Sequence, residues 1–250
     1  MKIKKFSEFI TEGMWGSALK RSNTAKERKE DKANRIQEFI DNQSESSSIY
    51  ITDGNVINSK GSIVIRNTDL VNGKRPFKFG RVDKDFYCYD CPSLTSLEGS
   101  PQKVGRDFYC SECTSLTSLE GAPQEVGRDF YCSNCTSLTS LEGAPQKVGW
   151  NFSCRDCTSL TSLEGAPQKV DGFFDCHKCT QLETLKGAPT YVGSDFYCSG
   201  CVSLESLEYI PEHVASWVIC GGCKSKFKFE DVKNICDVKE KNFKSDDILK

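Results

Sequence analysis

Seven Cys-x-x-Cys pairs, spaced 22 residues apart, are the residues of this 250-residue chain whose type and spacing could do chemistry. Thiolates are good zinc ligands, and two such pairs at this separation are typical of a four-thiolate zinc site. A zinc-stabilised array would take its first ligands from Cys88, Cys91, Cys110, Cys113, Cys132, Cys135, Cys154 and Cys157. The alternative is structural, because cysteine is also a small apolar side chain that is commonly buried.

Three features favour core packing over metal binding. Cys132 follows Phe130 by two residues, so both side chains point to the same face of a strand. Seven pairs cannot be divided evenly into sites of two pairs, and Ile65 stands at the first cysteine position of a degenerate unit. We therefore predict buried, reduced thiols, with no metal and no cofactor. The odd total of 15 cysteines, without an export signal, also favours free thiols in a reducing compartment.

The element that must position these cysteines is a short strand, repeated once per unit. Around Phe130 and Cys132, apolar and polar residues alternate with a period of two, as in a strand with one buried face. Leu138 and Leu141 follow on an irregular return, and Gly143 and Pro145 prevent a regular helix there. A strict period of 22 residues predicts a solenoid of stacked coils.

The repeating unit, read from Val126 to Pro145, resembles a leucine-rich repeat of the short bacterial and phage type. The resemblance covers about residues 83 to 223 and places Phe130 and Cys132 inward, Cys135 at the ladder position, and Leu138 and Leu141 on the return side. It implies a right-handed coil with one continuous parallel β-sheet, mainly β and irregular, with helices at the N-terminus.

The sequence as a whole predicts four segments along the chain. Residues 1 to 44 are charged and helical; 45 to 82 form an N-terminal cap with a degenerate coil, in which Ile63 and Ile65 replace Phe and Cys. Residues 83 to 223 form seven coils, and 224 to 250 a C-terminal cap. In the last coil Val218 replaces Phe, as expected of a terminal repeat that must face water.

The strand positions between the inward residues should lie on the outer face of the sheet. Aromatic, charged and imidazole side chains occupy them, and rigid aromatic residues suit protein recognition. We expect a protein partner to bind a concave sheet face through Tyr87, Tyr109, Tyr131, Arg155, Asp175, His177, Tyr197 and Trp217. The alternative is that the tyrosines only stack on one another as copies of the repeat.

The composition and motifs indicate a non-enzymatic, cytoplasmic protein. The formal net charge of -2 gives no reason to expect a nucleic-acid or membrane partner. No apolar run is long enough to cross a bilayer. No nucleophile, base and orienting group converge in the sequence, and His177 and His213 occupy unrelated positions in their units.

The first twelve residues carry a separate signal. Ile3, Phe6, Phe9 and Ile10 fall on one face of a helix. With Glu12 and Gly13, the segment resembles the capsid-targeting peptide of internal head proteins of T-even-type phages. That resemblance implies contact of residues 1 to 12 with a phage scaffold, cleavage between Glu12 and Gly13, and a place in the virion head. The alternative is an ordinary helix packed on the first coil. A second, charged helix is expected from about Thr24 to Asp41, with interleaved acids that favour solvent over nucleic acid.

Overall fold

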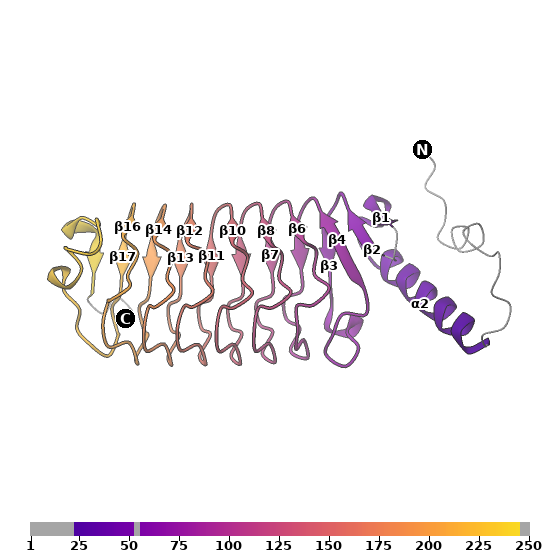
Figure 1. Ribbon diagram of the computed structural model, residues 1–250, viewed down its shortest axis with the longest axis horizontal. Helices are drawn as coiled ribbons and strands as arrows, with labels where there is room; N and C mark the ends of the chain where they lie inside the picture. The colour runs from indigo at the N-terminus through magenta and orange to yellow at the C-terminus, as the bar shows by residue number, and fades with distance from the viewer. Residues whose placement is uncertain (1–22, 53–55, 246–250) are drawn as a thin grey trace.

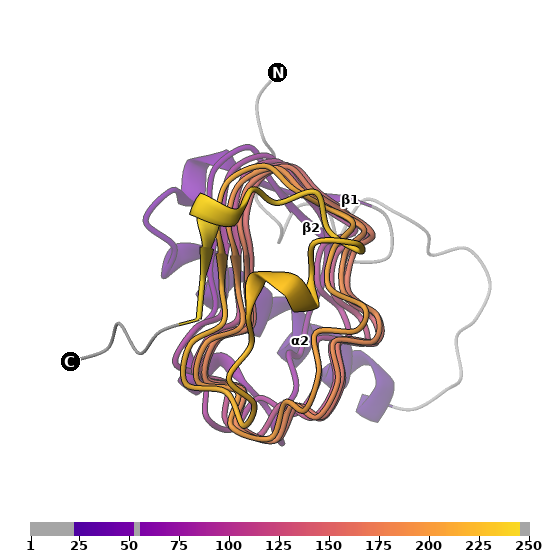
Figure 2. The ribbon, with the colours of Figure 1, turned by 90° about the vertical axis from the view of Figure 1, so that its left-hand side faces the viewer.

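The computed structural model describes residues 23–52 and 56–245, in which the chain winds into a β-solenoid (Figure 1). Each coil contributes a short strand to each of two sheets, so that the described residues form two nine-stranded sheets. The coils follow one another along a nearly straight axis, and Figure 2 shows them superimposed when viewed along it. The solenoid predicted from the 22-residue period is confirmed.

Sheet A contains the Lys-Val strands of the repeat. Its first pair, β1 with β2, is antiparallel, and every later pair is parallel. In spatial order the strands are β1 (Ile49–Thr52), β2 (Val56–Ser59), β4 (Lys78–Val82), β6 (Lys103–Val104), β8 (Glu125–Val126), β10 (Lys147–Val148), β12 (Lys169–Val170), β14 (Tyr191–Val192) and β16 (His213–Val214).

Sheet B contains the strands predicted from the alternation, and all of its pairs are parallel. They are β3 (Ile63–Val64), β5 (Phe86–Tyr87), β7 (Phe108–Tyr109), β9 (Phe130–Tyr131), β11 (Phe152–Ser153), β13 (Phe174–Asp175), β15 (Phe196–Tyr197), β17 (Val218–Ile219) and β18 (Phe243–Lys244). Ile63 pairs with Phe86, and Ile65 is buried, so these two isoleucines lie in line with the Phe and first Cys columns of the repeat.

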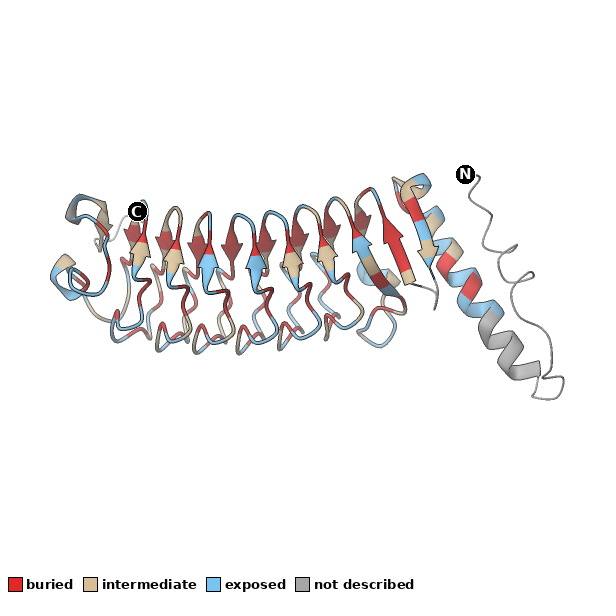
Figure 3. Cartoon of the chain, turned by 45° about the horizontal axis from the view of Figure 1, so that its top comes forward, coloured by how far each residue is buried: buried red, intermediate tan, exposed pale blue. Residues whose placement is uncertain are grey.

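The predicted single sheet is thus one of two. Sheet A was not expected, because around a Lys-Val strand only the valine is apolar and in most units no second apolar residue lies two positions away to show an alternating pattern. Its valines point inward opposite the phenylalanines of sheet B and complete the core. The stack also lacks the marked curvature that a concave binding face requires (Figures 1 and 3).

The core consists of side-chain columns that run along the solenoid axis. The phenylalanines from Phe86 to Phe196 are fully buried, with successive ring centroids 5.2 to 5.8 Å apart. The two leucine columns, which begin at Leu94 and Leu97, are equally buried. No coil could bury these residues alone, because each column is closed by the coils above and below.

The return of each coil includes a glycine that the stacking requires. Gly143 has φ +86°, and a Cβ there would lie 2.4 Å from the backbone nitrogen of Glu120. Neither the left-handed backbone nor the close approach to the neighbouring coil accommodates a side chain. This explains why the Leu-Glu-Gly-Ala-Pro stretch recurs.

The N-terminal end of the core is covered by helix α2 (Asn23–Asp41), which confirms the predicted charged helix. One of its faces carries buried Ile36 and Phe39, and the Phe39 ring lies 5.2 Å from that of Phe77. The helix therefore packs on the first coil rather than standing free in solvent. After the short turn η1 (Ser46–Ser48), β1 begins the solenoid; η2 (Asn67–Asp69) lies in the first return.

Both ends of the solenoid are capped by side chains. At the N-terminal edge, Gln43 accepts a hydrogen bond from the Val64 amide (2.8 Å) and donates one to its carbonyl (2.9 Å). At the other end, Asp237 accepts from the Val214 amide (3.1 Å) of the last strand of sheet A. The turns η3 (Phe229–Asp231) and η4 (Glu240–Asn242) belong to this C-terminal cap. Such contacts satisfy edge groups that would otherwise be open to another chain.

Candidate protein-interaction face and cysteine columns

The outer face of sheet B brings the predicted partner-binding tyrosines into one column. Tyr87, Tyr109 and Tyr131 are half-buried, and successive rings stack 5.0 Å apart at an interplanar angle of 15°. Burial raises the pKa of Tyr109 to about 12, so these phenols stay neutral at physiological pH. Tyr197 lies three coils beyond Tyr131, where its hydroxyl donates to Asp195 (2.8 Å).

A ladder of carboxyl and amide groups lies beside the tyrosines. Asp85, Asp107 and Asp129 are buried, and each accepts the backbone N–H of the equivalent residue in the next coil. The distances are 2.9 to 3.2 Å. Asn151 continues the ladder to Phe173, where a phenylalanine breaks it. The main role of the aspartate at this position is therefore structural, since it joins neighbouring coils.

The tyrosine column is interrupted in the middle coils by a polar network. Ser153 and Asp175 take the tyrosine positions and are buried, which corrects the expectation that Asp175 is exposed. Asp175 accepts a backbone hydrogen bond from His177 (3.0 Å), and its carboxylate lies 2.9 Å from the His177 ring Nδ1. The Ser153 hydroxyl reaches the carboxylate (3.5 Å), not the imidazole. A serine hydrolase needs the histidine between serine and acid, so this order is not that of a triad.

The two remaining predicted residues lie on the same face. Arg155 is exposed, and its Nε is 3.8 Å from the Asp156 carboxylate. Trp217 is half-buried, and the Lys244 ammonium lies 4.2 Å from its ring centroid. The face therefore combines aromatic rings and the exposed Arg155 guanidinium on a backbone held by sheet hydrogen bonds.

The cysteines form two buried columns, as predicted. The first column is Cys88, Cys110, Cys132, Cys154, Cys176, Cys198 and Cys220; the second is Cys91, Cys113, Cys135, Cys157, Cys179, Cys201 and Cys223. From Cys113 onward, each second-column thiol donates to the carbonyl of the first-column cysteine one coil earlier, at 3.0 to 3.2 Å. A buried carbonyl needs a donor, so the second column has a specific role.

The thiols of the first column have low chemical reactivity. Burial raises the pKa of the Cys88 and Cys220 thiols to about 12. Burial also raises the pKa of Cys110 and Cys132, and in Cys154 the hydrogen bond with Cys179 has the largest effect. Because the thiolate is the nucleophile and the metal ligand, these protonated thiols are poor at both tasks.

Within the described part of the chain, no three histidine, cysteine, aspartate or glutamate side chains gather into a group that could hold a metal ion. The metal-free state stays a prediction. Protein purified without chelator should contain well under one zinc ion per chain by elemental analysis. A stoichiometric content, with unfolding on chelation, would support the zinc-stabilised array.

Sequence reasoning missed Arg75, a charged residue in the core. Its guanidinium is buried; Nη2 donates to Ser100 (2.7 Å), while Nε and Nη1 have no partner. Loss of hydration lowers its pKa. The ring centroid of Phe86 lies 5.8 Å away, and the nearest thiols are those of the first two coils. No repeat pattern predicts this buried arginine, because it occurs only once in the sequence and not in every coil.

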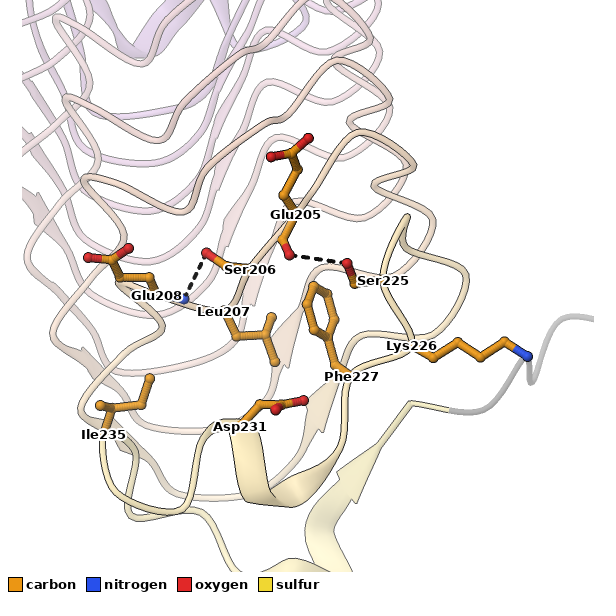
Figure 4. A pocket seen from close by; sticks show the side chains of 9 residues that line it. All are labelled: Glu205, Ser206, Leu207, Glu208, Ser225, Lys226, Phe227, Asp231 and Ile235. Atoms are coloured by element: carbon orange, nitrogen blue, oxygen red, sulfur yellow. Dashed lines mark hydrogen bonds between the residues drawn. The ribbon is translucent and has the colours of Figure 1, made fainter.

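A cavity of about 390 Å³ lies between the last coil and the C-terminal cap (Figure 4). Its walls carry no grouping of acid, base and nucleophile: the Ser225 hydroxyl donates to the Glu205 carbonyl, and Phe227 covers the inner side. The lining residues are Glu205, Ser206, Leu207, Glu208, Ser225, Lys226, Phe227, Asp231 and Ile235.

The predicted processing residues, Glu12 and Gly13, lie outside the described residues. Among the described helices, none is long and apolar enough to span a membrane. Comparisons with protein-family models, with curated proteins and with solved structures found no match to the chain. The repeat resemblance thus rests on the sequence unit itself.

Proposed function

We propose that this chain is a non-enzymatic protein-binding module of the leucine-rich-repeat type, encoded by a phage, that binds a partner protein through the outer face of sheet B. The observation that carries the proposal is the row of half-buried tyrosines at regular spacing, with Arg155 exposed beside it. Tyrosine and arginine are enriched among residues that dominate interface energies.

Rigidity supports the same function. Tyr87, Tyr109 and Tyr131 are held by stacking on one another, and the Tyr131 hydroxyl also donates to Asp129 (3.3 Å), so little side-chain entropy remains to be lost on binding. The middle coils vary the tyrosine position to Ser153 and Asp175 while the Phe and Cys columns continue unchanged. Variation at the surface over a constant core gives each coil a different contact, which is how a repeat module acquires specificity.

The test compares two triple variants with the wild-type chain. In the first, Tyr109, Tyr131 and Tyr197 are changed to Ala; in the matched control, Lys103, Lys147 and Tyr191 of sheet A are changed to Ala. Each protein is immobilised on a resin and incubated with an extract of infected cells. The proteins that the resin retains are then quantified by mass spectrometry. The retained partner, made recombinantly, is then titrated against all three.

We expect the sheet B variant to lose the partner, while the sheet A variant binds it as the wild type does. Both variants should keep the circular dichroism spectrum of the parent. Equal binding by all three proteins would contradict the proposal, and unfolding of the sheet B variant alone would make the tyrosine column structural.

The N-terminal resemblance extends the proposal to the virion head, where residues 1 to 12 would bind the scaffold and cleavage would follow Glu12. Peptide mapping of purified virions should then find a mature terminus at Gly13, and Glu12→Ala should leave the peptide attached. An intact Met1 terminus in virions, or no virion association, would return this segment to an ordinary helix.

A further inference from the structure

The interruption of the tyrosine column leaves two nitrogen-rich side chains beside each other on the face of sheet B. Arg155 and His177 occupy the same position of the repeat in adjacent coils. Backbone hydrogen bonds of 2.8 and 2.9 Å on either side of this position keep the two coils in register. Equivalent residues of such parallel neighbours lie about 4.8 Å apart, so one small group can reach both side chains.

Short side chains replace the tyrosine next to both groups. In the first coil of the array, the Tyr87 ring meets the residue two positions later, Tyr89, edge to face at a centroid distance of 6.2 Å. Ser153 and Asp175 stand at the position of Tyr87 in the two middle coils and carry no ring. The guanidinium and the imidazole that follow them therefore have no tyrosine ring of their own coil against them.

The polar ends of both side chains remain free for a ligand. Asp175 lies 2.9 Å from Nδ1 of His177, and because a carboxylate only accepts, that nitrogen carries the proton. Nε2 makes no hydrogen bond within the described residues and is not buried. Among the same residues, the Arg155 guanidinium approaches only Asp156, at 3.8 Å, which is beyond hydrogen-bond distance. Lys178 is exposed next to His177 and adds a positive charge.

We propose that Arg155 and His177 together bind an oxyanion of the partner protein, either an acidic side chain or a phosphoryl group. This assignment rests on the proposed function, because it names the chemistry that the face recognises. A guanidinium offers planar, charge-assisted donors that match carboxylate and phosphate oxygens, and a protonated imidazole donates from Nε2 as well. Asp175 holds the ring in place, since it accepts from the His177 amide (3.0 Å) and from Nδ1. The pair gives the middle coils a contact that the tyrosine column lacks.

The anion site is tested on the full-length chain with inorganic phosphate and acetate as separate probes. Each is titrated at constant ionic strength in mildly acidic buffer, in which an imidazole can take up its second proton. The histidine ring signals are followed by nuclear magnetic resonance. The chain has two histidines, and His213 also contacts a carboxylate, so it serves as the internal control. We expect a saturable shift of the His177 signals and no saturable shift of the His213 signals.

Two arginine variants separate specific binding from a general effect of charge. Arg155→Gln should weaken anion binding about tenfold or more, the loss expected for a hydrogen bond to a charged group. Arg128→Gln is the matched control, because the Arg128 side chain is 52% exposed against 50% for Arg155 and also lies 3.8 Å from a carboxylate. It should bind as the wild type does. Saturation by phosphate alone identifies a phosphoryl group, and saturation by acetate identifies an acidic side chain.

The assignment is overturned if neither anion gives a saturable shift, if both histidines shift equally, or if the two arginine variants lose binding alike. Such results leave the proposed function standing, because the tyrosines can bind a partner without an anion contact. Conversely, a partner that the sheet B tyrosine variant still retains contradicts the proposed function, whatever the titration shows. The titration of the wild-type protein decides the first two points even if a variant does not fold.

Discussion

The thiols of the two columns contribute to stability in different ways. Cys135 donates to the Cys110 carbonyl at 3.2 Å, whereas the best acceptor of Cys132 is the Ser153 carbonyl at 3.5 Å. A serine hydroxyl is shorter than a thiol, so at position 132 it would be buried without a good partner. At position 135 it can still donate to the carbonyl of the previous coil.

We therefore predict that the Ser and Ala variants rank in opposite order of unfolding free energy at the two positions. Cys132→Ser should cost about 1–3 kcal/mol of unfolding free energy, and more than Cys132→Ala, because an unpaired buried hydroxyl is costly. Cys135→Ala should cost more than Cys135→Ser, because alanine leaves the Cys110 carbonyl without a donor. Urea denaturation of the four variants measures this, and the same order at both positions would contradict it.

Arg75 provides a second prediction at the residue scale. Two of its guanidinium nitrogens lack partners in the core, so its burial is not compensated by an acid. Arg75→Met should raise the unfolding free energy by about 1–4 kcal/mol, the range seen when buried charged groups are replaced by apolar ones. Lys74→Met, at the exposed neighbouring residue, is the control and should change little. Destabilisation by Arg75→Met alone would show that the charge is compensated in the core.

At the scale of elements, the aspartate ladder joins successive strands of sheet B along their outer face. Asp107 accepts the Asp129 amide at 3.2 Å, and its Oδ1 is 3.8 Å from the Arg128 guanidinium. Burial raises its pKa all the same. Ionisation is thus harder in the folded chain than in the unfolded chain, and the carboxylate reduces stability at neutral pH. This cost disappears as the pH falls below the ordinary aspartate pKa of about 3.9.

Asp107→Asn should therefore stabilise the protein at pH 7, because the amide oxygen keeps the hydrogen bond without the charge, as Asn151 already does. The gain relative to the wild type should shrink at acidic pH, where both side chains are neutral. Asp107→Leu is the control that removes the acceptor, and it should destabilise at every pH. Thermal unfolding across this pH range is the measurement; a gain that grows on acidification would refute the argument.

The sequence predicted some of these elements and not others, for physical reasons. The Phe strand was visible because Phe130 and Cys132 alternate with polar residues. The Lys-Val strand was not, since in most units its single inward valine has no apolar residue two positions before or after it. The burial of Asp129 and Asp175 depends on hydrogen bonds to neighbouring coils, which no single unit displays. Arg75 was missed because it stands outside the repeat.

At the scale of the molecule, stability should be a sum over coils and their contacts. Deleting residues 114 to 135 joins Cys113 to Thr136, the same residue type as Thr114, and keeps every column continuous. We predict a folded chain, shorter by one coil, with a cooperative but weaker denaturant transition. Deleting only residues 114 to 124 shifts the inward residues of half a coil and should unfold the array. Similar stability of the two deletions, by circular dichroism and urea titration, would contradict a repeat-based core.

The two capped edges have a consequence for assembly. Parallel strands stacked in register, with like residues above like, are also the geometry of fibrils, in which nothing stops the addition of another chain. Here Gln43 occupies the backbone groups of β3 at one end, and Asp237 those of β16 at the other. These two side chains thus occupy one edge of each sheet, and the other two edges are formed by strands outside the repeat, β1 and β18. All four edges therefore differ from the repeat, so a second copy could not continue either sheet with like residues above like.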